Sequence, residues 1–138
     1  MPMDTNLIAA TVGIFAGAVG YWVATFWMRP ILRYKEIRSK VLSDFILYAQ
    51  VTNADGLNDR MKELYEERVF QIRRSAADLA ACLMELPHWY TCYLCLRGLS
   101  PKKAVTDLIG HSNTREHDAA DERVQRIKKS LGLKTEMV

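Results

Sequence analysis

Histidine and cysteine side chains gather in one short stretch of the chain, at a spacing that could support metal chemistry. His88, Cys92 and Cys95 follow one another at steps of four and three residues, and Cys82 lies upstream. Four such ligands could bind a tetrahedral zinc ion, but structural zinc sites usually hold their ligands in a small dedicated module. Here the segment is apolar and is predicted to be a buried helix, in which a free cysteine behaves as a small hydrophobic residue. We therefore expect core cysteines, no metal and no cofactor.

Charged residues on the longest candidate helix, residues 57–86, are the next group that could do chemistry. They are Glu66, Glu67, Arg68, Arg73, Arg74 and Asp78. Carboxylate pairs act in acid–base catalysis when their environments separate their pKa values around a substrate. These carboxylates are mixed with basic residues at helical spacing, which is typical of a solvated face. The sequence also contains no Gly-rich phosphate loop, nucleophile elbow or H-E-x-x-H motif. We therefore expect that the protein is not an enzyme.

A polar loop, Gly110 to Asn113, lies between two candidate helices near the C-terminus. The simpler interpretation is a helix stop followed by a helix start, with a capping box over Asn113-Thr114-Arg115-Glu116. The alternative is a contact surface for a partner. Its candidate residues are His111, Ser112 and Asn113 in the loop and Arg73 and Arg74 on the longest helix. Nucleic acid is not an expected partner, because the last helix mixes acidic and basic residues almost evenly and offers no basic face.

An uncharged, apolar run from Leu7 to Met28 opens the chain. A helix needs about 20 apolar residues to cross roughly 30 Å of hydrocarbon. Trp22 and Trp27 lie near one end of the run, where aromatic rings favour the membrane interface. A cleaved signal peptide fits less well, because the first four residues carry no Lys or Arg and the apolar run is too long. We therefore predict a transmembrane helix over residues 7–28.

A cluster of basic residues follows the apolar run directly. Its members are Arg29, Arg33, Lys35, Arg38 and Lys40. Because cytoplasmic flanks of membrane spans are rich in Lys and Arg, the short N-terminus is expected outside and the rest of the chain in the cytosol. Each basic residue near the surface also gains about 1 kcal/mol from anionic lipid head groups. The cluster therefore predicts both the topology and a contact with membrane lipid.

Small residues occupy one side of the predicted span. Ala9, Gly13 and Gly17 share a face, and Gly20 lies on an adjoining one. Small residues let two helices approach closely in lipid, where packing drives association. Gly and Ala are also frequent in membrane helices that do not associate. The pattern nevertheless favours a homo-oligomer that forms through this face.

The rest of the sequence predicts helices only. Pro30 predicts a kink or break near Arg29. An amphipathic helix follows and ends at a turn over residues 53–56. After the helix over 57–86, a short apolar helix over 88–96 is expected to be buried on all sides. Two further helices are expected. Ser100 is the N-cap of the first and Pro101 its first residue, and the capping box starts the second, which Gly132 ends.

The predicted fold class is therefore all-α, with an N-terminal transmembrane helix and a small cytosolic bundle of four or five helices. The predicted boundaries are 1–6 for the outer N-terminus, 7–28 for the span, 29–56 for the juxtamembrane helix and turn, 57–133 for the helical domain and 134–138 for a frayed tail. A second span over 79–99 is not expected, since Glu85 and Arg97 would enter the bilayer.

Three short motifs resemble those of a group of small bacterial proteins with an N-terminal span and a helical cytosolic region. They are Arg73-Arg74-x-Ala76-x-x-Leu79, Leu86-Pro87 and Leu108-Ile109-Gly110-x-Ser112-Asn113. The resemblance implies a bacterial inner-membrane setting and implies nothing about chemistry.

Two functions are compatible with this organisation. We expect a non-enzymatic, membrane-anchored interaction or assembly module, whose partners are membrane lipid, a second copy of the chain and an unidentified protein. The alternative is an oligomeric membrane effector, of the toxin or phage-defence type, that perturbs the bilayer. The Gly- and Ala-rich span favours the alternative, but a bare pore former does not need the large patterned domain that follows.

Overall fold

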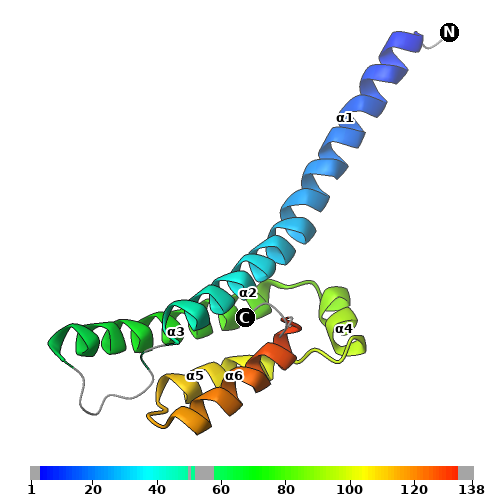
Figure 1. The fold of residues 1–138 in the computed structure, drawn as a ribbon. Helices are drawn as coiled ribbons and strands as arrows, with labels where there is room; N and C mark the ends of the chain where they lie inside the picture. The colour runs from blue at the N-terminus through cyan, green and yellow to red at the C-terminus, as the bar shows by residue number, and fades with distance from the viewer. Residues whose placement is uncertain (1–3, 50, 52–57, 134–138) are drawn as a thin grey trace.

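Helices and the turns between them make up the whole of the described chain, residues 4–49, 51 and 58–133 of this computed structural model (Figure 1). The elements are α1 (Thr5–Val23), η1 (Ala24–Met28), α2 (Arg29–Leu47), α3 (Asp59–Glu85), α4 (His88–Leu96), α5 (Pro101–Ser112) and α6 (His117–Leu131). The predicted all-α fold class is therefore confirmed. The predicted turn over 53–56 and the tail over 134–138 lie outside the described residues.

The first three elements form one continuous helix of 43 residues, from Thr5 to Leu47. Of the kink or break expected near Arg29, the break is absent, because the helix continues through this residue. Pro30 has no N–H, and its ring would clash with the carbonyl four residues earlier in a regular α-helix. The π turn η1 relieves this, because the Arg29 N–H donates to the Ala24 carbonyl, five residues earlier. The helix bends in this region and does not end (Figure 1).

A helical hairpin of α2 and α3 forms the frame of the folded domain. The buried face of α2 presents Tyr34, Ile37, Val41 and Phe45 to α3, at the predicted spacing of three and four residues. The Asn58 side chain caps α3 by accepting a hydrogen bond from the Met61 N–H at 3.0 Å. The helix ends at Glu85 because Pro87 holds Leu86 in an extended conformation.

The hydrophobic core lies between α3 and the helices α2 and α5, and it is closed by α6, which packs on α5 and also contacts α2. α3 packs against both α2 and α5, and α5 packs against α6. The core residues beyond those of α2 are Ile72, Ala76, Leu79, Cys82, Leu86, Tyr90, Leu94, Ala104, Leu108, Ile127 and Leu131. Leu83 and Val124 are half-buried against this cluster.

The ends of α5 and α6 follow the sequence signals in part. Pro101 opens α5, and Gly132 ends α6 in the left-handed conformation at φ 67°, both as predicted. The predicted capping box is wrong. α6 begins at His117, and its N-cap residue Glu116 makes no capping hydrogen bond with its side chain. The Asn113 side chain, which the capping box would have used, is engaged by α3 instead.

α4 is present as predicted, but it is not buried on all sides. Only Tyr90 and Leu94 reach the core. Trp89 is 51% exposed, Tyr93 44% and Leu96 87%. The helix lies at one end of the domain, so that a single face meets the other helices (Figure 1). A uniformly apolar sequence therefore marks a helix with an exposed apolar face, and not a central one.

Candidate functional site

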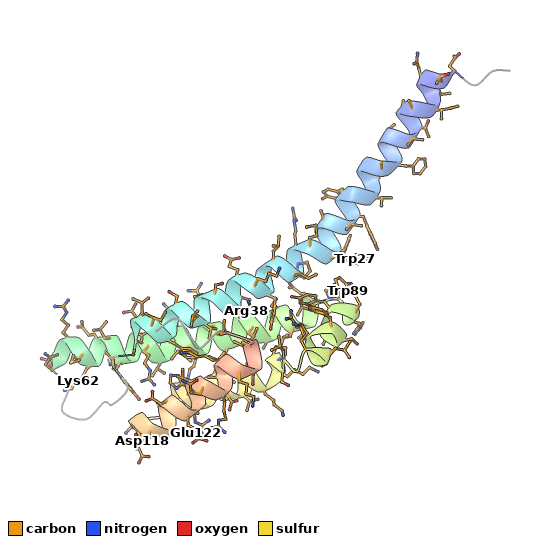
Figure 2. The ribbon with its side chains drawn as sticks, turned by 45° about the vertical axis from the view of Figure 1, so that its right-hand side comes forward. Trp27, Arg38, Lys62, Trp89, Asp118 and Glu122 are labelled. Atoms are coloured by element: carbon orange, nitrogen blue, oxygen red, sulfur yellow. The ribbon has the colours of Figure 1, made fainter. Side chains whose placement is uncertain are left out.

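The apolar segment formed by α1 and η1 is the first candidate site, because it contains no buried residue. Among the described residues, its helix is the one whose length and composition would allow it to cross a membrane. Ile14 is 73% exposed and Phe15 67%. Figure 2 shows side chains projecting from both visible sides of this part of the helix, with no other helix of the described chain beside it. An exposed apolar surface of this extent is typical of a segment that contacts a membrane or another protein.

The small residues of this segment form an open face. Apart from the neighbouring backbone of the helix itself, no atom of the described chain lies within 4 Å of the position that a Cβ would take at Gly13, Gly17 or Gly20. Ala9, one turn before Gly13, is also exposed. The four residues predicted to mediate helix association are therefore uncovered by their own chain, and association itself remains a prediction.

The five basic residues after the apolar segment all lie on α2, in two kinds of environment. Arg29, Arg33 and Lys35 are exposed, and Arg38 and Lys40 are half-buried. Arg33 forms an ion pair with Glu85 of α3, with 3.0 Å between nitrogen and oxygen. Arg38 donates to the carbonyl of Leu131 at 3.4 Å. Part of this basic cluster therefore also links α2 to the rest of the domain.

The candidate partner contacts lie on two segments that the fold brings together. The Arg73 guanidinium donates to the Asn113 side-chain oxygen at 2.7 Å and to the Ser112 hydroxyl at 3.4 Å. Ser112 is buried and donates to the Ile109 carbonyl at 2.7 Å. Arg73, Arg74 and Asn113 are exposed. The hydrogen bonds of Arg73 join α3 to the C-terminal end of α5. Arg73, Arg74 and Asn113 are also accessible to a partner.

Arg68 lies in the interior of the domain and not on its surface. It was expected on a solvated face, yet only 1% of it is exposed. Its guanidinium donates to the carbonyls of Val51 at 2.7 Å, His111 at 3.2 Å and Thr114 at 3.4 Å. A buried cation is stabilised by such charge-assisted hydrogen bonds. Arg68 therefore ties together the segment after α2, the end of α5 and the loop that follows it.

One sequence signal could have located Arg68. It lies four residues before Ile72, on the same helical stripe as Ala76 and Leu79. A long cation on the buried stripe of a helix usually marks a position where backbone carbonyls need a donor. Asp44 is a parallel case on α2, because it is buried beside Phe45 and accepts a hydrogen bond from the Ser75 hydroxyl at 3.0 Å.

His111 is enclosed beside Arg68 and is not a surface residue. Its ring stands edge-on to Phe45, with 5.4 Å between the ring centres. Burial is the main cause that lowers the pKa of His111 to about 4, and the cations of Arg68 and Arg123 lower it further, while a backbone hydrogen bond with Ala120 opposes them. The imidazole is therefore neutral at pH 7 and cannot serve as a cationic contact.

A cavity of about 340 Å³ opens next to these groups. Its charged and titratable lining residues include Asp44, Arg68, His111, Asp121 and Lys128. Arg68 is held by backbone carbonyls and Asp44 by a serine hydroxyl. The arrangement supplies hydrogen bonds that position three helices, and it offers no nucleophile activated by an adjacent base.

The cysteines differ from the prediction. Cys82 is buried, and its thiol donates to the Pro30 carbonyl at 3.6 Å, but Cys92 and Cys95 are exposed. The interpretation of the last two as core residues is wrong, because they lie on the uncovered face of α4. Within the described ranges, no group of three or more His, Cys, Asp and Glu side chains is placed to hold a metal ion. The absence of a metal stays a prediction.

Comparisons with protein-family models, with curated proteins and with solved structures found no match.

Proposed function

We propose that the protein is a non-enzymatic, membrane-anchored interaction module. In this proposal α1 and η1 span the membrane, and α2 to α6 form a cytosolic helical bundle that binds protein partners. The observation that carries it is the uninterrupted helix from Thr5 to Leu47, which is apolar and unburied in its first part and packed into a domain in its second. A helix satisfies its own backbone hydrogen bonds, as a membrane span must.

The orientation rests on the basic cluster of α2. Arg29, Arg33 and Lys35 are exposed directly after the apolar segment, and this flank is expected to stay in the cytosol of a bacterial cell, with the N-terminus outside. The bundle faces the cytosol in consequence, and Arg73, Arg74 and Asn113 are its accessible polar contacts for a partner.

Self-association through the small-residue face belongs to the same proposal. Gly13 and Gly17 leave an open strip along α1, on which a second copy of the helix can pack closely. The alternative, an oligomeric effector that perturbs the bilayer, would use the same face. A membrane-potential dye separates the two, because an effector depolarises cells on overexpression and an interaction module does not.

A pair of fusions after Val138 tests the anchor and its orientation. We expect a reporter that is active only in the periplasm to be silent and one that is active only in the cytosol to be bright. The chain should stay in the membrane pellet after extraction with alkaline carbonate. Strong periplasmic activity would contradict the orientation, and release of the chain by carbonate would contradict the anchor.

A further inference from the structure

The exposed face of α4 is a surface that neither the core nor the proposed partner contacts explain. Trp89, Cys92, Tyr93 and Leu96 follow one another at steps of three, one and three residues and share one side of the helix. All four are exposed, and Leu96 is 87% exposed. No side chain of α4 is acidic or basic, apart from that of His88. This side of the helix is therefore apolar and aromatic, with its polar groups limited to a phenol, an indole and thiols.

The position of α4 relative to the apolar segment is fixed by an aromatic contact. The rings of Trp27 in η1 and Trp89 in α4 meet edge to face, with 6.1 Å between their centres. Figure 2 shows the two side chains close together where the long helix passes the end of α4. Trp27 lies at the C-terminal end of the proposed span, where tryptophan favours the level of the lipid head groups. Trp89 must then lie at that level as well.

A groove of about 440 Å³ opens between α2 and α4, beside these two tryptophans. Three of its lining residues are cations, namely Lys35, Arg38 and Arg97, and none is a carboxylate. Trp89, Tyr90 and Tyr93 supply its aromatic wall. The groove therefore combines cationic and aromatic lining residues.

The charges of the three cations in the groove are not neutralised by a carboxylate of the described chain, although Arg38 also donates to the carbonyl of Leu131. Among the described residues, none of them forms an ion pair with a carboxylate. The Arg38 Nε is buried without a hydrogen-bond partner in the described chain. Arg97 donates to the Tyr93 hydroxyl at 2.9 Å, and its guanidinium lies 5.7 Å from the centre of that ring. The guanidinium is thus held at the mouth of the groove, beside the exposed face of α4.

We propose that α4 lies in the membrane interface and that the groove between α2 and α4 binds the phosphate of an anionic phospholipid. This inference rests on the proposed function, because the span sets the depth of Trp27. A phospholipid offers both features that the site requires, a phosphate for Lys35, Arg38 and Arg97 and acyl chains for the face that includes Leu96. A soluble partner would not be expected at the depth that the contact between Trp27 and Trp89 imposes.

Single-tryptophan variants of the full chain test the depth. In phosphatidylcholine nanodiscs that contain lipids brominated at known depths, Trp89 in the W22F/W27F variant should be quenched from the same shallow level as Trp27 in the W22F/W89F variant. Quenching of Trp27 without Trp89 would overturn the placement of α4 and leave the span intact. Quenching of neither would overturn the span, and this inference with it.

Lipid binding tests the groove. We expect the Kd for phosphatidylglycerol, read from Trp89 emission of the W22F/W27F chain in neutral detergent, to rise about fivefold on Lys35→Gln and about fivefold on Arg97→Gln. Lys102→Gln and Lys103→Gln are the matched controls, because both residues are exposed on α5 outside the groove. Free glycerol phosphate should bind far more weakly than the lipid. Equal losses in the controls, or equal binding of glycerol phosphate, would overturn the proposal.

Discussion

The two halves of the helix from Thr5 to Leu47 share one helical backbone, but they differ in charge and in burial. The first half, α1 with η1, has no charged residue and no buried one. The second half, α2, carries five Arg and Lys side chains in its first twelve residues and buries five others against the domain. A regular hydrogen-bond ladder, interrupted only by the π turn, continues from one to the other. The helical backbone therefore does not distinguish the exposed apolar half from the half packed into the domain. The side-chain composition does distinguish them.

Substitutions in these two halves should affect different properties of the protein. Substitutions in the half that we propose for the membrane act on association, and substitutions against α2 act on folding of the domain. Measurements on the full chain can separate the two, since unfolding of α2 to α6 is followed by chemical denaturation in mild detergent and association by particle mass.

The largest effect is expected for Leu79→Ala. Leu79 is completely buried in the core cluster, and a large-to-small change in such a position costs about 2–5 kcal/mol. Phe15→Ala is the control, because Phe15 is exposed on α1 and should leave the unfolding free energy of the domain unchanged. An equal loss of unfolding free energy in both variants would mean that α1 and the domain fold as one unit, and it would contradict their separation.

The next effect is acid sensitivity of the domain through His111. Its pKa is about 4 when folded and 6.5 when free, so the unfolded chain takes up the proton first. Stability is therefore complete above pH 6.5 and falls as the pH is lowered toward 4, by up to about 3 kcal/mol. His111→Gln should flatten the His-dependent part of this profile between pH 6.5 and 4. His88→Gln, at an exposed site, should not, and an unaltered profile in His111→Gln would contradict the assignment.

The smallest effect on folding is expected for Gly17→Ile, which should nevertheless have the largest effect on association. Gly17 is exposed on α1, and a Cβ at this position would meet no atom of the described chain beyond the neighbouring helix backbone, so the domain should lose less than about 0.5 kcal/mol. In lipid-like detergent the added side chain should hold two spans apart and lower the particle mass. Val19→Ile, on the opposite side of α1, is the matched control and should leave the mass unchanged. An oligomer that survives Gly17→Ile would move the association surface to another part of the chain.

Periodicity was sufficient to predict most of the helices. The stripe of Tyr34, Ile37, Val41 and Phe45 predicts a one-sided helix, and the structure buries these four residues. Pro87 and Gly132 end helices for local steric reasons that need no tertiary information. Pro30 is different, because whether a proline breaks a helix depends on whether the turn before it can widen, and η1 does so here.

Burial of individual polar and apolar residues was harder to predict, because it depends on which helix faces which. Arg68 has the same chemistry as Arg73 and lies on the same helix, yet only Arg68 meets the carbonyls of Val51, His111 and Thr114. On α4 the opposite happened, because residues that were expected to be buried are exposed. Its apolar sequence could not reveal that Cys92 and Cys95 lie at the edge of the domain, where no other helix of the described chain covers them.

The π turn also has a mechanical consequence. An α-helix advances by about 100° per residue, so the one extra residue that a π turn accommodates rotates everything beyond it by roughly that angle. The azimuth of the small-residue face of α1 relative to the buried face of α2 is therefore set by residues 24–28. Because the helix is continuous, a rotation of α1 about its long axis would also rotate α2 and the domain packed against it. If two copies pair through α1, the continuous helix would therefore fix the orientation of their two domains relative to each other. A flexible linker in place of η1 would leave that orientation free.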